Sequence, residues 1–114
     1  MKRRQFLQSA GLMGAMSTLP TNQTPQPIII ATWKNEEGTK AGWDKIMQTG
    51  KALDGVEAGA WVPEANPEET TVGYGGYPDR DGHVTLDACI MDHLGNAGSV
   101  TFLEGIMHPI SVAR

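Results

Sequence analysis

Residues 72–92 read VGYGGYPDRDGHVTLDACIMD, and this stretch carries the strongest fold signal of the chain. Gly73, Gly75 and Gly76 remove three Cβ atoms within four residues, which permits positive φ angles and close approach of another segment. Turn-forming residues follow, and residues 83–91 then alternate between apolar and polar side chains. The pattern predicts a backbone corner that leads into a β-strand.

A β-hairpin is expected in the last third of the chain. Residues 83–91 and 98–103 predict its two strands, and residues 92–96 contain Gly and Asn suited to the turn. Little charge occurs on either face, which favours a sheet covered on both sides. Cys89, the single cysteine, is expected to be a small buried residue. A nucleophilic role for it would need a cysteine-hydrolase signature, which the sequence lacks.

Helical and extended segments are expected before this hairpin. The β-branched run at residues 28–32 predicts a strand buried on both faces. A helical pattern begins at Ala41, and Gly50 is placed to end that helix. A second helix is expected near Lys51, and the acidic segment EANPEE at residues 64–69 predicts a surface loop. From these residues alone, the fold class is mixed α and β.

Two glycines and a proline weaken the second helix in this interpretation. They are Gly55, Gly59 and Pro63. A glycine in a helix interior costs about 1 kcal/mol relative to alanine, so the helix needs support from packing.

The beginning of the chain is typical of an export signal. Residues 1–20 combine a basic start with a weakly apolar stretch, and residues 21–27 form a polar linker. Arg3 and Arg4 followed by Gln-Phe-Leu resemble a twin-arginine signal, although the general export pathway and an ordinary amphipathic helix are the alternatives. The apolar stretch is shorter than the roughly 20 residues of a membrane span. The expected location is the bacterial periplasm or exterior, with no membrane partner.

Charge and motif spacing exclude several classes of partner. The formal net charge is −4, and the residues after the basic start carry six basic and thirteen acidic side chains. Such an acidic body is unsuited to nucleic acid. His83, His93 and His108 lack metal-ligand spacing, and GYGGY lacks the GxGxxG phosphate-binding pattern. No metal and no cofactor are expected.

Three segments together resemble a known family. PIIIATW at residues 27–33, the stretch at residues 72–92 and HPISVAR at residues 108–114 resemble glycosylasparaginase, one of the N-terminal nucleophile hydrolases. The resemblance extends from about Pro27 to Arg114. It implies an α/β (α+β) fold in which residues 28–114 form an incomplete domain, the N-terminal portion of the α subunit, within a four-layer αββα sandwich.

The resemblance also implies an activity. Members of the family hydrolyse the amide that joins N-acetylglucosamine to asparagine, giving aspartate and a glycosylamine. They cleave themselves before a threonine in a His-Asp-Thr segment, and this threonine becomes the nucleophile. No His-Asp-Thr occurs in the 114 residues. We therefore expect no catalytic residue in this chain, which would be inactive alone and would need the remainder of the α subunit and the β subunit as partners.

Two other functions remain as alternatives. The related isoaspartyl peptidase and L-asparaginase branch shares the fold and nucleophile, although Trp33 and VGYGGYPDRDG favour the glycosylasparaginase branch. A secreted binding piece without catalysis is the alternative from another class.

Trp33 is the residue expected to bind substrate. At the exit of the first strand, tryptophan offers an apolar wall and one N–H donor, and the family's substrate-lining tryptophan matches it. The alternative is a core tryptophan, which is the role expected of Trp43 and Trp61.

Asp87 is the charged exception within the predicted strand. The favoured interpretation is a structural carboxylate near the site, which accepts amide bonds from the loop at residues 73–76 or pairs with Arg80. The alternative is a general base. The three glycines of the loop are likewise expected to be structural.

Overall fold

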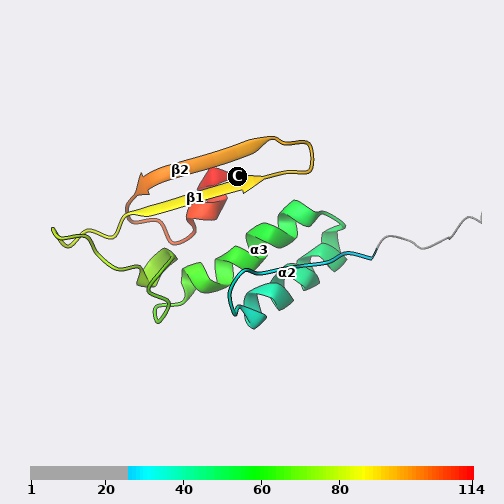
Figure 1. The fold of residues 1–114 in the computed structure, drawn as a ribbon, viewed down its shortest axis with the longest axis horizontal. Coiled ribbons are helices and arrows are strands. Elements are labelled where there is room, and N and C mark those ends of the chain that lie inside the picture. The colour runs from blue at the N-terminus through cyan, green and yellow to red at the C-terminus, as the bar shows by residue number, and fades with distance from the viewer. Residues whose placement is uncertain (1–25) are drawn as a thin grey trace, which may run out of the picture.

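The computed structural model describes residues 26–114, which form a pair of helices, a short 3-10 turn, a β-hairpin and a final short helix (Figure 1). The elements are α2 (Glu36–Thr49), α3 (Ala52–Ala65), η1 (Gly73–Gly75), β1 (Leu86–Met91), β2 (Ala97–Leu103) and α4 (Pro109–Ala113). The mixed α and β class is confirmed at this level. The predicted export signal at residues 1–20 and most of the linker lie outside the described residues.

Helix α2 begins earlier than the sequence pattern predicts. Asn35 is its N-cap, and the Asn35 side chain accepts a hydrogen bond of 3.0 Å from the backbone N–H of Gly38. Glu36 and Glu37 occupy the first turn, where negative charge interacts favourably with the helix dipole. The predicted start at Ala41 is therefore wrong, because apolar periodicity begins only after this polar cap.

The end of α2 follows the prediction. Gly50 adopts a left-handed conformation with φ of 70° and ψ of 10°, and its N–H donates to the carbonyl oxygen of Ile46. Lys51 then stands as the N-cap of α3, at the expected position.

Glycines allow α2 and α3 to pack closely against each other. A Cβ atom at Gly42 would lie 2.7 Å from the carbonyl oxygen of Gly55, and one at Gly59 would lie 3.0 Å from that of Gly38. Both separations are shorter than ordinary van der Waals contact. The glycines predicted to weaken α3 thus form its contact surface with α2.

The segment at residues 28–32 is extended but pairs with no strand in the part of the chain that the structure describes. Instead it runs across the helix pair (Figure 1), where Ile29 reaches Gly42. Ile28 and Ile30 are 80% and 84% exposed. The predicted strand buried on both faces is therefore not formed, because the segment packs on the helices and lies away from the ladder of β1 and β2.

Strands β1 and β2 form the predicted antiparallel hairpin. Leu86 pairs with Leu103 and Ile90 with Gly98, and residues 92–96 make the turn. Leu86 and Ile90 are buried on one face, whereas Cys89 is exposed on the other. The prediction of a buried Cys89 is wrong, because within residues 26–114 only one face of the hairpin is covered.

Helix α4 fills the space between α3 and the hairpin. Ile110 and Ala113 are buried with Ile90, and Leu53 of α3 packs against this cluster. The indole N–H of Trp61 donates to the Ser111 hydroxyl at 2.7 Å, so this tryptophan connects α3 to α4. The core of the described unit is thus built around a helix of five residues.

Candidate functional site

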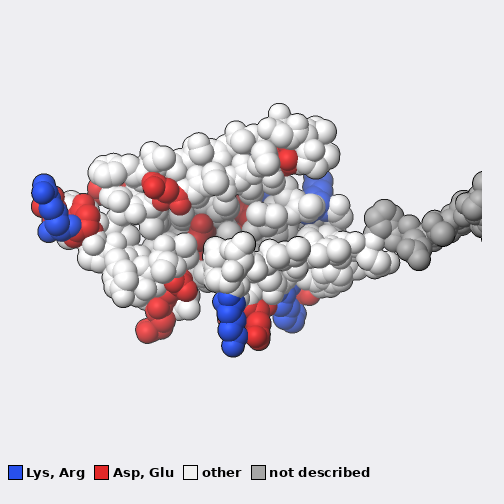
Figure 2. Space-filling model, in the orientation of Figure 1, with Lys and Arg blue, Asp and Glu red and all other residues white. Residues whose placement is uncertain are grey.

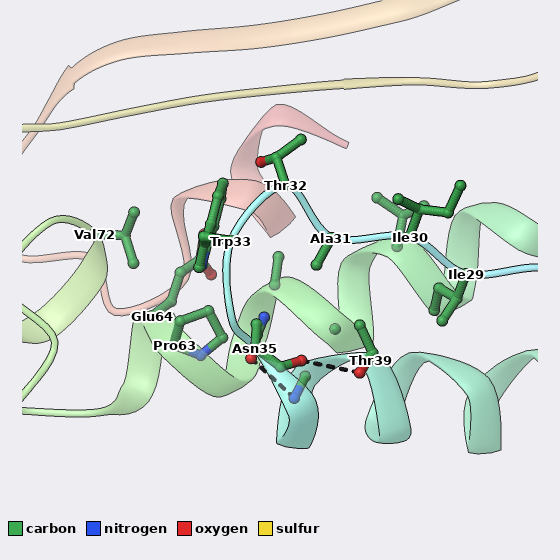
Figure 3. A pocket seen from close by; sticks show the side chains of 14 residues that line it. Ile29, Ile30, Ala31, Thr32, Trp33, Asn35, Thr39, Pro63, Glu64 and Val72 are labelled. Carbon is green, nitrogen blue, oxygen red and sulfur yellow. Dashed lines mark hydrogen bonds between the residues drawn. The ribbon is translucent and has the colours of Figure 1, made fainter.

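Trp33 stands at the bend between the extended segment and the N-cap of α2. It lines a pocket of about 300 Å³ that is bounded by residues 29–33, by Asn35 and by the facing sides of α2 and α3. Figure 3 shows the indole beside Pro63 and Val72. Trp33 is 60% exposed, so it is a wall of the pocket and not a core residue of the described unit. The expectation that it binds substrate remains a prediction.

The pocket is mostly apolar, with few polar groups available to a ligand. The Asn35 amide oxygen already accepts from the Gly38 N–H, and the Thr39 hydroxyl donates to the carbonyl oxygens of Asn35 and Glu36. No hydrogen bond joins the indole N–H of Trp33 to another described residue. Such a pocket suits a small ligand with an apolar surface and a hydrogen-bond acceptor.

Glu64 is a buried acid that the sequence pattern does not reveal. The prediction of a surface loop at residues 64–69 is wrong at its first two residues, because α3 continues through Ala65, and Glu64 is only 5% exposed. One carboxylate oxygen accepts from the backbone N–H of Ile110 at 3.2 Å, and the other lies 3.2 Å from Nδ1 of His108. The partners that bury it come from far along the chain, so local composition could not reveal them.

Burial raises the pKa of the Glu64 carboxyl above its ordinary value of 4.5. The Ile110 N–H and the neighbouring His108 oppose this shift, and the charge of Glu57 adds to it. A carboxyl group with a raised pKa in a pocket is a recognised mark of a functional site, although structural networks produce it as well.

The glycine corner, formed by residues 73–76, lies against the end of α3 that carries Glu64. Gly73 has φ of 61°, and a Cβ there would overlap the backbone of Glu64. Gly75 approaches the carbonyl oxygens of Pro67 and Glu69 in the same manner. The predicted close approach of another segment to these glycines is thus confirmed. Val72, which directly precedes the corner, lines the Trp33 pocket.

Gly76 belongs to the same corner although its φ is not positive. Its φ is −52°, and its N–H donates to the carbonyl oxygen of Gly73. A Cβ there would lie 3.2 Å from Val84 and 3.4 Å from Leu86, so the glycine leaves room for the first residues of the hairpin.

Asp87 lies away from the pocket. It is exposed, and its carboxylate accepts from the backbone N–H of Phe102 at 2.8 Å. The predicted partners are wrong, because the side chain faces across the hairpin and Arg80 contacts Asp81 at 3.4 Å instead. Phe102 has a positive φ of 59° at an irregularity of the register, so Asp87 holds a bulge of β2.

Residues 26–114 contain no group of three His, Cys, Asp or Glu side chains placed to hold a metal ion. Within the same range no helix has the length and apolar character to cross a membrane.

Comparison with known proteins gives one family. The family model described as "Asparaginase" matches residues 10–114. The chain is 44% identical to the N(4)-(beta-N-acetylglucosaminyl)-L-asparaginase of Elizabethkingia miricola, over 98% of this chain and 37% of the relative. It is 41% identical to the mouse protein of the same name, over 84% of this chain and 28% of the relative.

A relative of the other branch is also similar. The probable isoaspartyl peptidase/L-asparaginase 3 of Arabidopsis thaliana is 33% identical over 77% of this chain and 25% of the relative. The chain therefore spans between a quarter and just over a third of the length of these three relatives. These similarities confirm the resemblance to glycosylasparaginase that the sequence motifs indicate.

Proposed function

The chain belongs to the asparaginase family, and we propose on this basis that it is part of an enzyme that hydrolyses the amide between N-acetylglucosamine and asparagine. The strongest support is the similarity of nearly the whole chain to a relative named for this activity. The pocket beside Trp33 is compatible with the same function, since it offers an apolar wall and an indole N–H donor to a small ligand that carries a hydrogen-bond acceptor.

In the proposed reaction, the remainder of the enzyme supplies a threonine nucleophile that becomes available by self-cleavage. Its hydroxyl oxygen attacks the side-chain carbonyl carbon of the glycosylated asparagine, and its proton moves to the leaving nitrogen. The C–N bond breaks and the glycosylamine departs. Water then hydrolyses the threonine ester, which releases aspartate. The described residues contribute the Trp33 wall, and the chain alone is inactive.

The bare face of the hairpin supports a four-layer sandwich in the complete enzyme. Met91 is 66% exposed and Phe102 71% exposed, whereas α4 covers the opposite face. Figure 2 shows few charged atoms over the hairpin, while charged side chains gather along α2. A second sheet from the remaining α subunit or the β subunit would cover this surface. The extended segment at residues 28–32 would then pair as a strand.

We also propose that the enzyme is exported to the bacterial periplasm or exterior. Its residues precede the described range, so this location rests on the basic start and the apolar stretch of the sequence.

A chimaeric enzyme tests the proposed function. Residues 26–114 would replace the matching segment of the Elizabethkingia miricola relative, and maturation would be followed by the appearance of two subunits on a gel. We expect release of aspartate from N-acetylglucosaminyl-asparagine at a higher kcat/KM than from an isoaspartyl dipeptide. The reverse preference would favour the isoaspartyl peptidase branch. A matured chimaera inactive on both substrates would refute the catalytic proposal and leave a binding piece.

The same chimaera tests Trp33. Trp33→Phe keeps most of the apolar wall but loses the N–H donor, so we expect a loss of about 1 to 3 kcal/mol in transition-state stabilisation. Trp43→Phe is the matched control, because Trp43 is half-buried on α2 and does not line the pocket. Equal kcat/KM for the two matured variants would exclude a pocket role for Trp33.

A further inference from the structure

Acids of α3 hold α4 at both of its ends. Glu57 accepts a hydrogen bond from the Ser111 hydroxyl at 2.7 Å and pairs with the Arg114 guanidinium. Glu64, two helical turns further along, accepts from the Ile110 N–H and contacts His108. Glu57 thus anchors the end of α4 together with Asp54, which pairs with the same Arg114 guanidinium, and Glu64 anchors its beginning.

Only one of these anchors also reaches the Trp33 pocket. Glu64 lines this pocket, whereas Glu57 does not. The backbone of Glu64 is in addition the surface against which Gly73 packs, so the glycine corner is placed by the same residue. Figure 3 shows Glu64 and Pro63 at the same end of the pocket as Trp33.

We propose that Glu64 is a positioning residue for the Trp33 pocket, because this one residue of the pocket wall holds the start of α4 through its buried carboxylate and meets the glycine corner through its backbone. This inference rests on the proposed function and adds to it a residue that acts through Trp33 without touching the reacting atoms. Glu57 anchors the same helix but has no such role.

The burial of Glu64 explains why its removal affects the pocket. A buried N–H that loses its acceptor is costly, so without the carboxylate the Ile110 N–H must move toward another partner. His108 would lose its partner as well, and its ring lies 5.6 Å from that of Trp61 on α3. The end of α3 next to Trp33 would therefore shift, and small displacements of a binding wall weaken substrate positioning.

Four variants of the active chimaera test this role. Glu64→Ala removes the whole anchor, and Glu64→Gln keeps an oxygen for the Ile110 N–H but presents an amide to His108. Glu57→Ala and Glu57→Gln are the matched controls, since they weaken the attachment of α4 without altering the pocket lining. The steady-state kcat and KM of each matured enzyme for N-acetylglucosaminyl-asparagine are measured.

We expect KM to rise about tenfold in Glu64→Ala and about threefold in Glu64→Gln, with kcat changed less than about twofold, because the lost contacts position the wall and not the nucleophile. Both Glu57 variants should keep KM within about twofold of the parent. If Glu64→Ala does not mature, the two Gln variants decide the question.

Equal KM values for the Gln variants, or equal KM values for the Ala variants, would show that Glu64 is only an anchor of α4 and would overturn the proposal. Inactivity of the unsubstituted chimaera is a separate result, since it would refute the proposed function itself.

Discussion

Replacing Gly42 with alanine tests the contact between α2 and α3. The new Cβ would lie 2.7 Å from the carbonyl oxygen of Gly55, whereas ordinary contact begins at 3.4 Å. The missing 0.7 Å has to come from separation of the helices, because the atom that is met belongs to the backbone. The same Cβ would also meet the Ile29 side chain, which can move aside more easily.

The expected net destabilisation follows from two opposing effects. Overpacking against a backbone atom costs about 2 to 3 kcal/mol, near the upper end for inserted methyl groups. Alanine is more favourable than glycine inside a helix by about 1 kcal/mol. The difference is a loss of about 1 to 2 kcal/mol, which corresponds to a fall in Tm of about 4 to 16 °C for a unit of this size.

Thermal unfolding followed by far-UV circular dichroism measures this change on the 114-residue chain. Gln48→Ala, at an exposed position of the same helix, is the control and should alter stability by less than about 0.5 kcal/mol. A Tm of Gly42→Ala at or above that of the parent would mean that the two helices do not meet through their glycines, and the reasoning would fail.

Three further predictions concern ionisation, strain and exposure. Because the folded-state pKa of Glu64 is raised, its stabilising contribution is full below about pH 4.5 and is lost as the pH rises through the folded value. Glu64→Gln should therefore gain stability relative to the parent as the pH rises above about 4.5 in urea titrations, and a constant difference would contradict this. Phe102→Gly should relieve about 1 kcal/mol of strain at a positive φ, and the urea midpoint measures it against Phe102→Ala, which keeps the strain. The isolated chain should bind a hydrophobic dye through its bare sheet face, and introducing lysine at Met91 should reduce that signal.

Features determined by near neighbours could be predicted from the sequence. The left-handed Gly50, the glycine corner at Gly73 and the alternation of β1 each depend on residues within a few positions. The earlier start of α2 was also readable, because Asn35 followed by two glutamates is a typical helix start. Apolar periodicity alone does not contain that signal.

Features that depend on distant partners could not be predicted in this way. The buried Glu64 receives its contacts from residues 44 and 46 positions away, and α4 is a short helix that is stable only where α3 and the hairpin enclose it. The expected partners of Asp87 were the glycine loop or Arg80, whereas its observed partner, Phe102, lies on the opposite strand at a bulge. Trp33 lines a pocket where the family resemblance predicts one, and its role in binding a ligand stays a prediction.

The anchoring of α4 has a consequence for the order in which the chain folds. The helix pair and the hairpin are each formed by segments adjacent in sequence, so their closure costs little entropy and they can form early. The hydrogen bonds from α4 to α3 span 44 to 60 residues. They can form only after residues 108–114 have left the ribosome. Until then the helix pair and the β-hairpin are separate units, and the pocket wall at Glu64 lacks the contacts with α4 that support it.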